Sequence, residues 1–163
     1  MIIINKSGHL KYKNLKFRCA LGKAGIGEKS MEGDNLTPKG IYKIVNIYYR
    51  KDRIKKISSK FTPIKITKNM GWCDDPLSKK YNQLIKLPKK YSYEKLYKEN
   101  NTYDLLLVLD YNMKPIVKNK GSAIFIHVAK PQYKKTAGCI ALKKNHLIQL
   151  IKIINKKTKI NIY

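Results

Sequence analysis

Two nearly continuous apolar runs, LLLVL at 105–109 and AIFIHVA at 123–129, constrain the fold of this chain most strongly. Each has the length of a strand and is bounded by turn residues, and such a run predicts a strand buried on both faces. The run IYKIVNIYY at 41–49 is rich in β-branched and aromatic residues and also predicts a strand. Shorter runs at 1–4, 15–21 and 61–68 add further strands, without βαβ alternation.

Two segments predict helices. YSYEKLYKEN at 91–100 has a composition and length typical of a helix. The segment 145–154 places four leucines and isoleucines at helical spacing after Asn145, a residue suited to cap a helix. We therefore expect one mainly β domain over residues 1–163, a sandwich or barrel-like core with two or more helices at its edge.

Charge is the most unusual bulk property of the chain. Thirty-six Lys and Arg against ten Asp and Glu give a net charge of +26, which attracts polyanions such as nucleic acid, acidic wall polymers or anionic lipid. The lysines are dispersed in pairs, and no RNP, KH or helix-turn-helix pattern is present. A basic nucleic-acid-binding module stays open as an alternative function, although no specific nucleic acid is expected. No run approaches the ~20 apolar residues of a membrane span.

Cysteine and histidine spacing excludes several kinds of site. Cys19, Cys73 and Cys139 lie far apart without a C-x-x-C pair, which argues against a disulfide framework or a thiolate zinc site. His9 and His146 stand at a turn and at a helix start, and form no metal motif with the third histidine. We expect neither a metal nor a cofactor.

His127 and Cys139 are the candidates for chemistry. The pleat of 124–129 places His127 on the face of Phe125, opposite Ile126. Taken singly, a histidine there is a core residue bound to a backbone carbonyl, and a lone cysteine is a small buried side chain. The short segment between them can bring imidazole and thiol together, so that the imidazole takes the thiol proton and the sulfur attacks an amide carbonyl. Gly138 would leave room beside the sulfur for that amide.

A second polar cluster follows Trp72. Asp74 and Asp75 precede a proline, so they form either an ordinary turn or a pair of carboxylates for acid–base work or for binding a substrate amine. Cys73 is the second-choice nucleophile, because no histidine lies near it in the sequence.

The segment from His127 through Thr136-Ala137-Gly138-Cys139 resembles the catalytic signature of the L,D-transpeptidase family, the YkuD domain. The upstream EGDNLTPKGIYKI is similar to the entry of that family into a strand. GWCDDP, HVAKPQY and TAGCIAL further resemble a proteobacterial branch, and the similarity extends from about Cys19 to Ile154. Ala137 and Ala141 stand where the family commonly has His and Asn or Arg.

The resemblance implies a β-sandwich-like catalytic domain that acts on peptidoglycan stem peptides and forms crosslinks in cell-wall biogenesis. Cys139 would attack the stem at the L-centre of diaminopimelate and expel D-alanine, after which the amine of a second stem resolves the acyl-enzyme. If water resolves it, the enzyme is an L,D-carboxypeptidase or endopeptidase. His127 would be the general base, the backbone N–H groups of Gly138 and Cys139 the oxyanion donors, and the Val128 carbonyl the group that orients the imidazole.

The residues that position the substrate are assigned less directly. We expect them among Thr136, Lys143, Trp72 and Asp74, with Lys130 and Lys134 as further ligands for substrate carboxylates. The substrate implies a periplasmic location, but no export signal is visible at the N-terminus, so a cytoplasmic location stays open. We expect a monomer whose partners are stem peptides or muropeptides.

Overall fold

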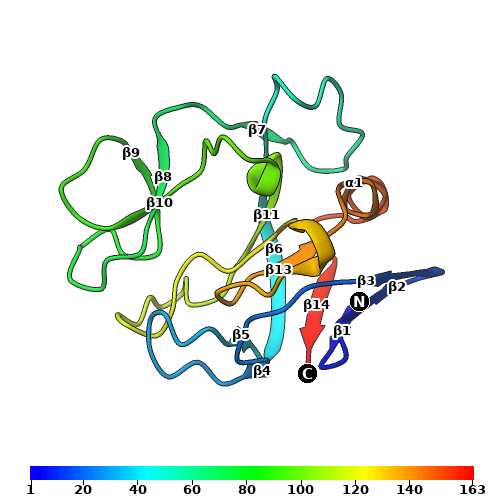
Figure 1. Ribbon diagram of the computed structural model, residues 1–163, viewed down its shortest axis with the longest axis horizontal. Coiled ribbons are helices and arrows are strands. Elements are labelled where there is room, and N and C mark those ends of the chain that lie inside the picture. Colours follow the sequence, from blue (N-terminus) through cyan, green and yellow to red (C-terminus); the bar gives the residue numbers. More distant parts are fainter.

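The computed structural model describes residues 1–163 and is built mainly from strands (Figure 1). The strands are β1 (Ile2–Asn5), β2 (His9–Tyr12), β3 (Leu15–Arg18), β4 (Ile26–Gly27), β5 (Thr37–Pro38), β6 (Gly40–Tyr49), β7 (Ile64–Lys65), β8 (Met70–Cys73), β9 (Leu84–Lys86), β10 (Tyr93–Lys95), β11 (Leu105–Leu109), β12 (Phe125–Val128), β13 (Ile140–Leu142) and β14 (Lys159–Ile162). The helical elements are α1 (Lys144–Ile153) and two 3-10 turns, η1 (Asn101–Tyr103) and η2 (Pro131–Tyr133).

The main sheet closes almost completely into a barrel. Its strand order is β13-β12-β11-β6-β14-β1-β2-β3, with β7 added beside β6. The chain just beyond β3 then returns to the first strand of this order, because Ala20 and Ala141 exchange backbone hydrogen bonds of 2.8 and 2.9 Å. The expected mainly β, barrel-like core is confirmed. A separate sheet of order β10-β8-β9 lies to one side of the barrel (Figure 1).

Strand β11 is the centre of the packing, and all five of its residues are buried. Leu105, Leu107 and Leu109 face the large hydrophobic cluster inside the barrel. Leu106 and Val108 face a smaller cluster under the three-stranded sheet. The prediction of a strand buried on both faces is therefore confirmed, and each such side chain contributes about 1.5 to 3 kcal/mol by leaving water.

The structure has one α-helix instead of the expected two or more. Helix α1 buries Leu147, Leu150 and Ile151 as its spacing predicts, but Lys143 precedes it as N-cap residue without a side-chain capping bond, so the capping prediction for Asn145 was wrong. The helix predicted at 91–100 was also wrong. Part of that segment pairs with β8 as β10, where cross-strand packing outweighs a weak helical propensity. None of the helices has the length and hydropathy needed to cross a lipid bilayer.

Candidate active site

Strands β12 and β13 place His127 and Cys139 on the same face of the main sheet. The two strands are parallel, with Ile126 opposite Ile140 and His127 opposite Ala141. Since alternate residues of a strand share a face, Cys139, two residues before Ala141, lies on the same face as the imidazole and two residue positions away along the ladder. Both side chains line one cavity of about 580 Å³.

The environment of His127 fixes its protonation. Its Nδ1 lies 3.0 Å from the Val128 carbonyl, and because a carbonyl only accepts, Nδ1 carries the proton and donates it. The other ring nitrogen, Nε2, is then free to accept a proton. Burial lowers the pKa of His127 from 6.5 to about 4, so the imidazole is neutral at neutral pH. The Tyr103 ring packs edge-on against it at a centroid distance of 5.4 Å.

The Cys139 thiol is also neutral in the resting site. Its S–H donates to the Ala123 carbonyl at 3.2 Å, and its sulfur accepts the N–H of Phe125 at 3.4 Å. Burial raises the pKa of Cys139 from 9.0 to about 12. At neutral pH the cavity therefore holds a neutral thiol and a neutral imidazole.

Thr136 holds the turn that carries the cysteine. Its hydroxyl donates to the Cys139 carbonyl at 2.6 Å and accepts the N–H of Gly138 at 3.1 Å. The Gly138 N–H, expected as an oxyanion donor, is thus engaged within the turn, whereas the Cys139 N–H makes no hydrogen bond in the protein. Of the two expected donors, only Cys139 presents a free N–H.

Gly138 serves a different purpose from the one expected. Its φ of +138° is one that residues with a side chain rarely adopt, and a Cβ would lie 2.8 Å from the Leu36 carbonyl oxygen. The space beside this residue is therefore filled by the backbone of Leu36 and gives no room to a substrate amide. Glycine is required because two segments of backbone approach closely there.

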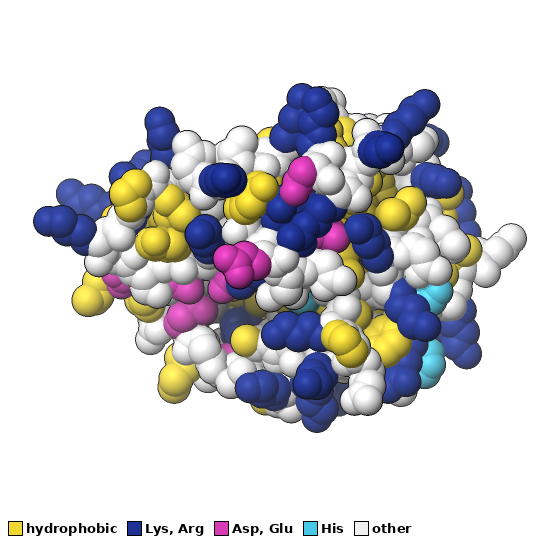
Figure 2. Space-filling view, turned by 45° about the horizontal axis from the view of Figure 1, so that its top comes forward, with side chains coloured by type: hydrophobic (Ala, Val, Ile, Leu, Met, Phe, Trp, Pro, Cys, Tyr) yellow, Lys and Arg dark blue, Asp and Glu magenta, His cyan; other side chains and the backbone are white.

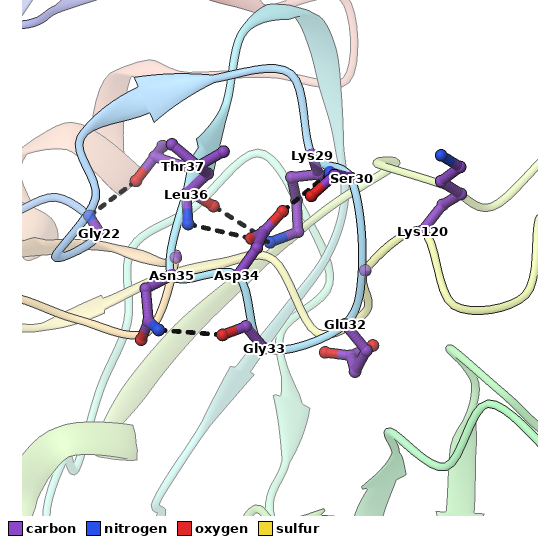
Figure 3. A network of polar contacts seen from close by, with 12 residues as sticks. Gly22, Lys29, Ser30, Glu32, Gly33, Asp34, Asn35, Leu36, Thr37 and Lys120 are labelled. Carbon is purple, nitrogen blue, oxygen red and sulfur yellow. Dashed lines mark hydrogen bonds and ion pairs between the residues drawn. The ribbon is translucent and has the colours of Figure 1, made fainter.

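The segment 22–37 is held by a network of polar contacts (Figure 3), and its Leu36 carbonyl oxygen lies against Gly138 of the cysteine turn. The carboxylate of Asp34 accepts the backbone N–H groups of Ser30 and Leu36 at 2.9 and 3.0 Å and forms a buried ion pair with Lys29. Lys29 Nζ also donates to the Leu36 carbonyl at 3.2 Å, which fixes the oxygen that contacts Gly138. Thr37, from the motif LTPKG, is fully buried and accepts the N–H of Gly22.

Not all the predicted substrate-positioning residues reach the cavity. Thr136, Asp74, Lys130 and Lys134 line it. Lys143 is exposed and lies outside the lining.

Trp72 also fails to reach the cavity. Its side chain is buried, with its indole N–H donating to Asn82 at 3.0 Å and its ring edge-on to Phe125. Its large apolar ring completes the small cluster under the three-stranded sheet, behind the wall of the cavity.

The two aspartates after Cys73 divide the roles predicted for them. Asp75 accepts the N–H of Leu77 at 2.9 Å and forms the turn. Asp74 accepts the hydroxyl of Ser92 at 2.6 Å and lines the cavity. Cys73 itself is fully buried and lies outside the cavity lining, so it is not an accessible nucleophile.

The sequence reasoning missed much of the cavity wall, including Glu94, Lys98, Tyr103 and Ser122. The first two lay in the segment interpreted as a helix. The alternation of Tyr91 and Tyr93 with polar residues was the available signal for a strand there. No group of three or more His, Cys, Asp or Glu side chains is placed to hold a metal ion.

A comparison with known protein families identifies the family of this chain. The model of the L,D-transpeptidase catalytic domain, YkuD, matches residues 1–162. The chain belongs to this family. Among solved structures, the YkuD chain is similar to one titled "Structure of the Ldtfm-avibactam carbamoyl enzyme", with 13% sequence identity and a TM-score of 0.49. The match covers 99% of this chain and 47% of that one, so this YkuD chain spans about half the length of its neighbour. No curated protein matches significantly.

Proposed function

We propose that this YkuD chain is a cysteine-dependent L,D-transpeptidase that acts on peptidoglycan stem peptides through a thioester at diaminopimelate. The observation that carries the proposal is the shared cavity of Cys139 and His127, in a chain that the family model matches almost from end to end. The substrate implies a periplasmic site of action.

The first half of the reaction follows from the two neutral groups. As the sulfur of Cys139 attacks the carbonyl carbon, its proton passes to Nε2 of His127, and the Val128 carbonyl stabilises the imidazolium through Nδ1–H. The Cys139 N–H is the donor available to the tetrahedral oxyanion. When the intermediate collapses, the carbon–nitrogen bond breaks, and the leaving D-alanine amine takes the proton from the imidazolium.

The second half returns the thiol. The amine of another stem attacks the thioester carbonyl, His127 accepts its proton, and the proton then returns to the departing sulfur. Water can take the place of the amine, which gives a shortened stem instead of a crosslink. Transpeptidation and hydrolysis therefore use the same residues and differ in the group that reaches the thioester.

Defined tetrapeptide-stem muropeptides and mass spectrometry test the proposal. Wild-type protein is expected to yield crosslinked dimers, and Cys139→Ala to yield neither dimers nor shortened stems. Cys73→Ala is the matched control, since this cysteine lies outside the cavity, and it is expected to retain turnover. Shortened stems without dimers would identify a carboxypeptidase or endopeptidase.

The alternative from another class rests on charge. Lysines are spread over the visible face of the molecule and are not gathered into one groove (Figure 2). A nucleic-acid-binding module would leave every muropeptide unchanged and bind nucleic acid with an affinity that falls steeply with salt. That combination of results would overturn the enzymatic proposal.

A further inference from the structure

The acidic residues of the chain are confined to one part of the sequence. All ten lie between Glu28 and Asp110, so the segments 1–27 and 111–163 contain lysine and arginine but no acidic side chain. These two segments supply β1, β2, β3 and β14, which are neighbours in the main sheet. The fold therefore brings together four strands free of acidic residues, beside β6, which has none either.

Backbone pairing aligns the outward-facing side chains of these five strands. One row of paired residues crosses all five strands in the order Lys16, Lys11, Ile3, Asn161 and Ile41. Residues that alternate with them, such as Leu10 and Ile160, are buried inside the barrel. We call the outward surface the basic sheet face; its members are Ile3, Lys11, Lys16, Ile41, Lys43, Val45, Lys159 and Asn161.

Two pairs of lysines face each other directly on the basic sheet face. Lys11 lies opposite Lys16, and Lys43 lies opposite Lys159, in antiparallel ladders that hold such Cβ atoms about 5 Å apart. Like charges placed opposite each other destabilise a sheet, and none of these four exposed lysines forms an ion pair. The Asp110 carboxylate accepts only the backbone N–H of Lys43. Anions supplied from outside the protein would relieve this repulsion.

Aliphatic side chains among the lysines indicate the kind of anionic partner. Ile41 is 58% exposed and Val45 is 43% exposed. The face has no Tyr, Phe or Trp on which the bases of a single-stranded nucleic acid could stack, because Tyr12 and Phe17 of these strands are buried. A nucleic-acid duplex would contact the lysines and gain nothing from the aliphatic groups. An anionic lipid surface uses both, since its phosphates attract lysines and its headgroup boundary accepts aliphatic side chains.

The basic sheet face lies across the barrel from the cavity. In the closed order of strands, three strands separate β1 from β12, the strand of His127, in either direction around the barrel. In Figure 1, β1, β2 and β3 lie on the other side of β6 from the three-stranded sheet, whose Asp74 and Glu94 segments line the cavity. Contact with a surface through β1 therefore leaves the cavity facing away from that surface.

We propose that the basic sheet face binds the surface of a bilayer that contains anionic phospholipids. Its four lysines contact lipid phosphates, and Ile41 and Val45 enter the boundary between headgroups and acyl chains. The association is peripheral and reversible, and it presents the cavity to a substrate outside the bilayer. This inference goes beyond the proposed enzymatic function and does not depend on it.

Sedimentation with lipid vesicles tests the inference. The purified protein is mixed, at physiological ionic strength, with vesicles of phosphatidylcholine alone or of equal parts phosphatidylcholine and phosphatidylglycerol. Wild-type protein is expected to sediment with the second kind and not with the first. Each lysine near an anionic surface contributes about fivefold in affinity, so the variant Lys11→Gln/Lys16→Gln/Lys43→Gln/Lys159→Gln should lose at least about a hundredfold.

A matched variant removes the same charge from another part of the molecule. Lys79→Gln/Lys80→Gln/Lys89→Gln/Lys90→Gln replaces four exposed lysines in the segments that flank β9, and it is expected to lose less than about tenfold. Circular dichroism checks that both quadruple variants are folded.

A second variant tests the aliphatic contribution at constant charge. Ile41→Thr/Val45→Thr keeps two β-branched residues in β6, and it is expected to weaken vesicle binding severalfold because less apolar surface enters the headgroup boundary. Its affinity for duplex DNA should equal that of the wild-type protein.

The outcomes distinguish a lipid surface from the other polyanions. Equal losses in the two quadruple variants would assign binding to net charge alone and overturn the inference. Failure of the wild-type protein to bind anionic vesicles would overturn it as well, and so would release from them by duplex DNA at an equal phosphate concentration. Acylation of Cys139 by a soluble stem should proceed at the same rate with and without vesicles, and a rate that falls on vesicle binding would refute the outward placement of the cavity. Absence of acylation in both states would refute the proposed function and leave the membrane inference standing.

Discussion

Replacing His127 by glutamine tests whether this imidazole is held neutral in the folded protein. Glutamine keeps an N–H donor for the Val128 carbonyl but does not titrate. The unfolded histidine binds a proton below pH 6.5, and the folded one only below about pH 4. Between these values the unfolded state binds more protons, so the free energy of unfolding of the wild-type protein falls as the pH falls.

The size of the effect follows from the two pKa values of His127. Their separation of about 2.5 pH units corresponds to about 3 kcal/mol of stability that is present above pH 6.5 and lost by about pH 4. The variant lacks this contribution, and its free energy of unfolding should depend on pH correspondingly less in this range.

Urea denaturation at a series of pH values measures the effect. The difference in free energy of unfolding between wild-type protein and His127→Gln is expected to change by about 3 kcal/mol across the window. Circular dichroism at neutral pH checks that the variant is folded. If the free energies of unfolding of wild-type protein and His127→Gln change with pH in parallel between pH 4 and pH 6.5, the conclusion that burial holds His127 neutral is refuted.

Three further predictions concern the site and its support. Because the pKa of His127 is about 4, kcat/KM for stem peptides should rise through about pH 4 and stay level through neutral pH, and a midpoint near 6.5 would contradict the neutral pair. Gly25→Ala is expected to lower the free energy of unfolding by about 1 kcal/mol, because Gly25 has a positive φ but open space around it. Gly138→Ala should lower it at least twice as much, because its Cβ would also meet the Leu36 carbonyl oxygen. Equal losses in urea denaturation would show that the Leu36 carbonyl moves aside. Asp104→Asn should cost about 3 kcal/mol in the same assay, because this buried carboxylate bridges two cationic side chains, and a loss below about 1 kcal/mol would show that both pairs are screened.

Local sequence pattern was enough to predict β11, which is buried on both faces, and α1, which buries one face. The continuous apolar run of β11 predicts burial of both its faces, and all five of its residues are buried. The helical spacing of Leu147, Leu150 and Ile151 predicts one buried face of α1, and these three side chains are buried. The prediction of a helix at 91–100 failed because helical propensity contributes little free energy per residue. Pairing with β8 adds hydrogen bonds to a strand that the composition of the segment itself does not reveal.

The polar wall of the site could not be predicted for a related reason. Glu94 reaches the cavity only because β10 pairs with β8 in one register, and a shift of one residue would turn it to the other face. The role of Gly138 likewise depends on Leu36, a residue about a hundred positions earlier in the chain. His127 and Cys139 were accessible to sequence reasoning because a short segment joins them, with His127 inside an apolar strand and Cys139 directly before another.

The paired backbones of Ala20 and Ala141 have a consequence for handling the protein. Without the chain beyond β3, β13 would become an open edge whose unpaired N–H and C=O groups invite another molecule to add a strand. A change that displaces Ala20 from Ala141 but keeps β1 to β3 should therefore favour self-association through the strand next to the reactive sulfur.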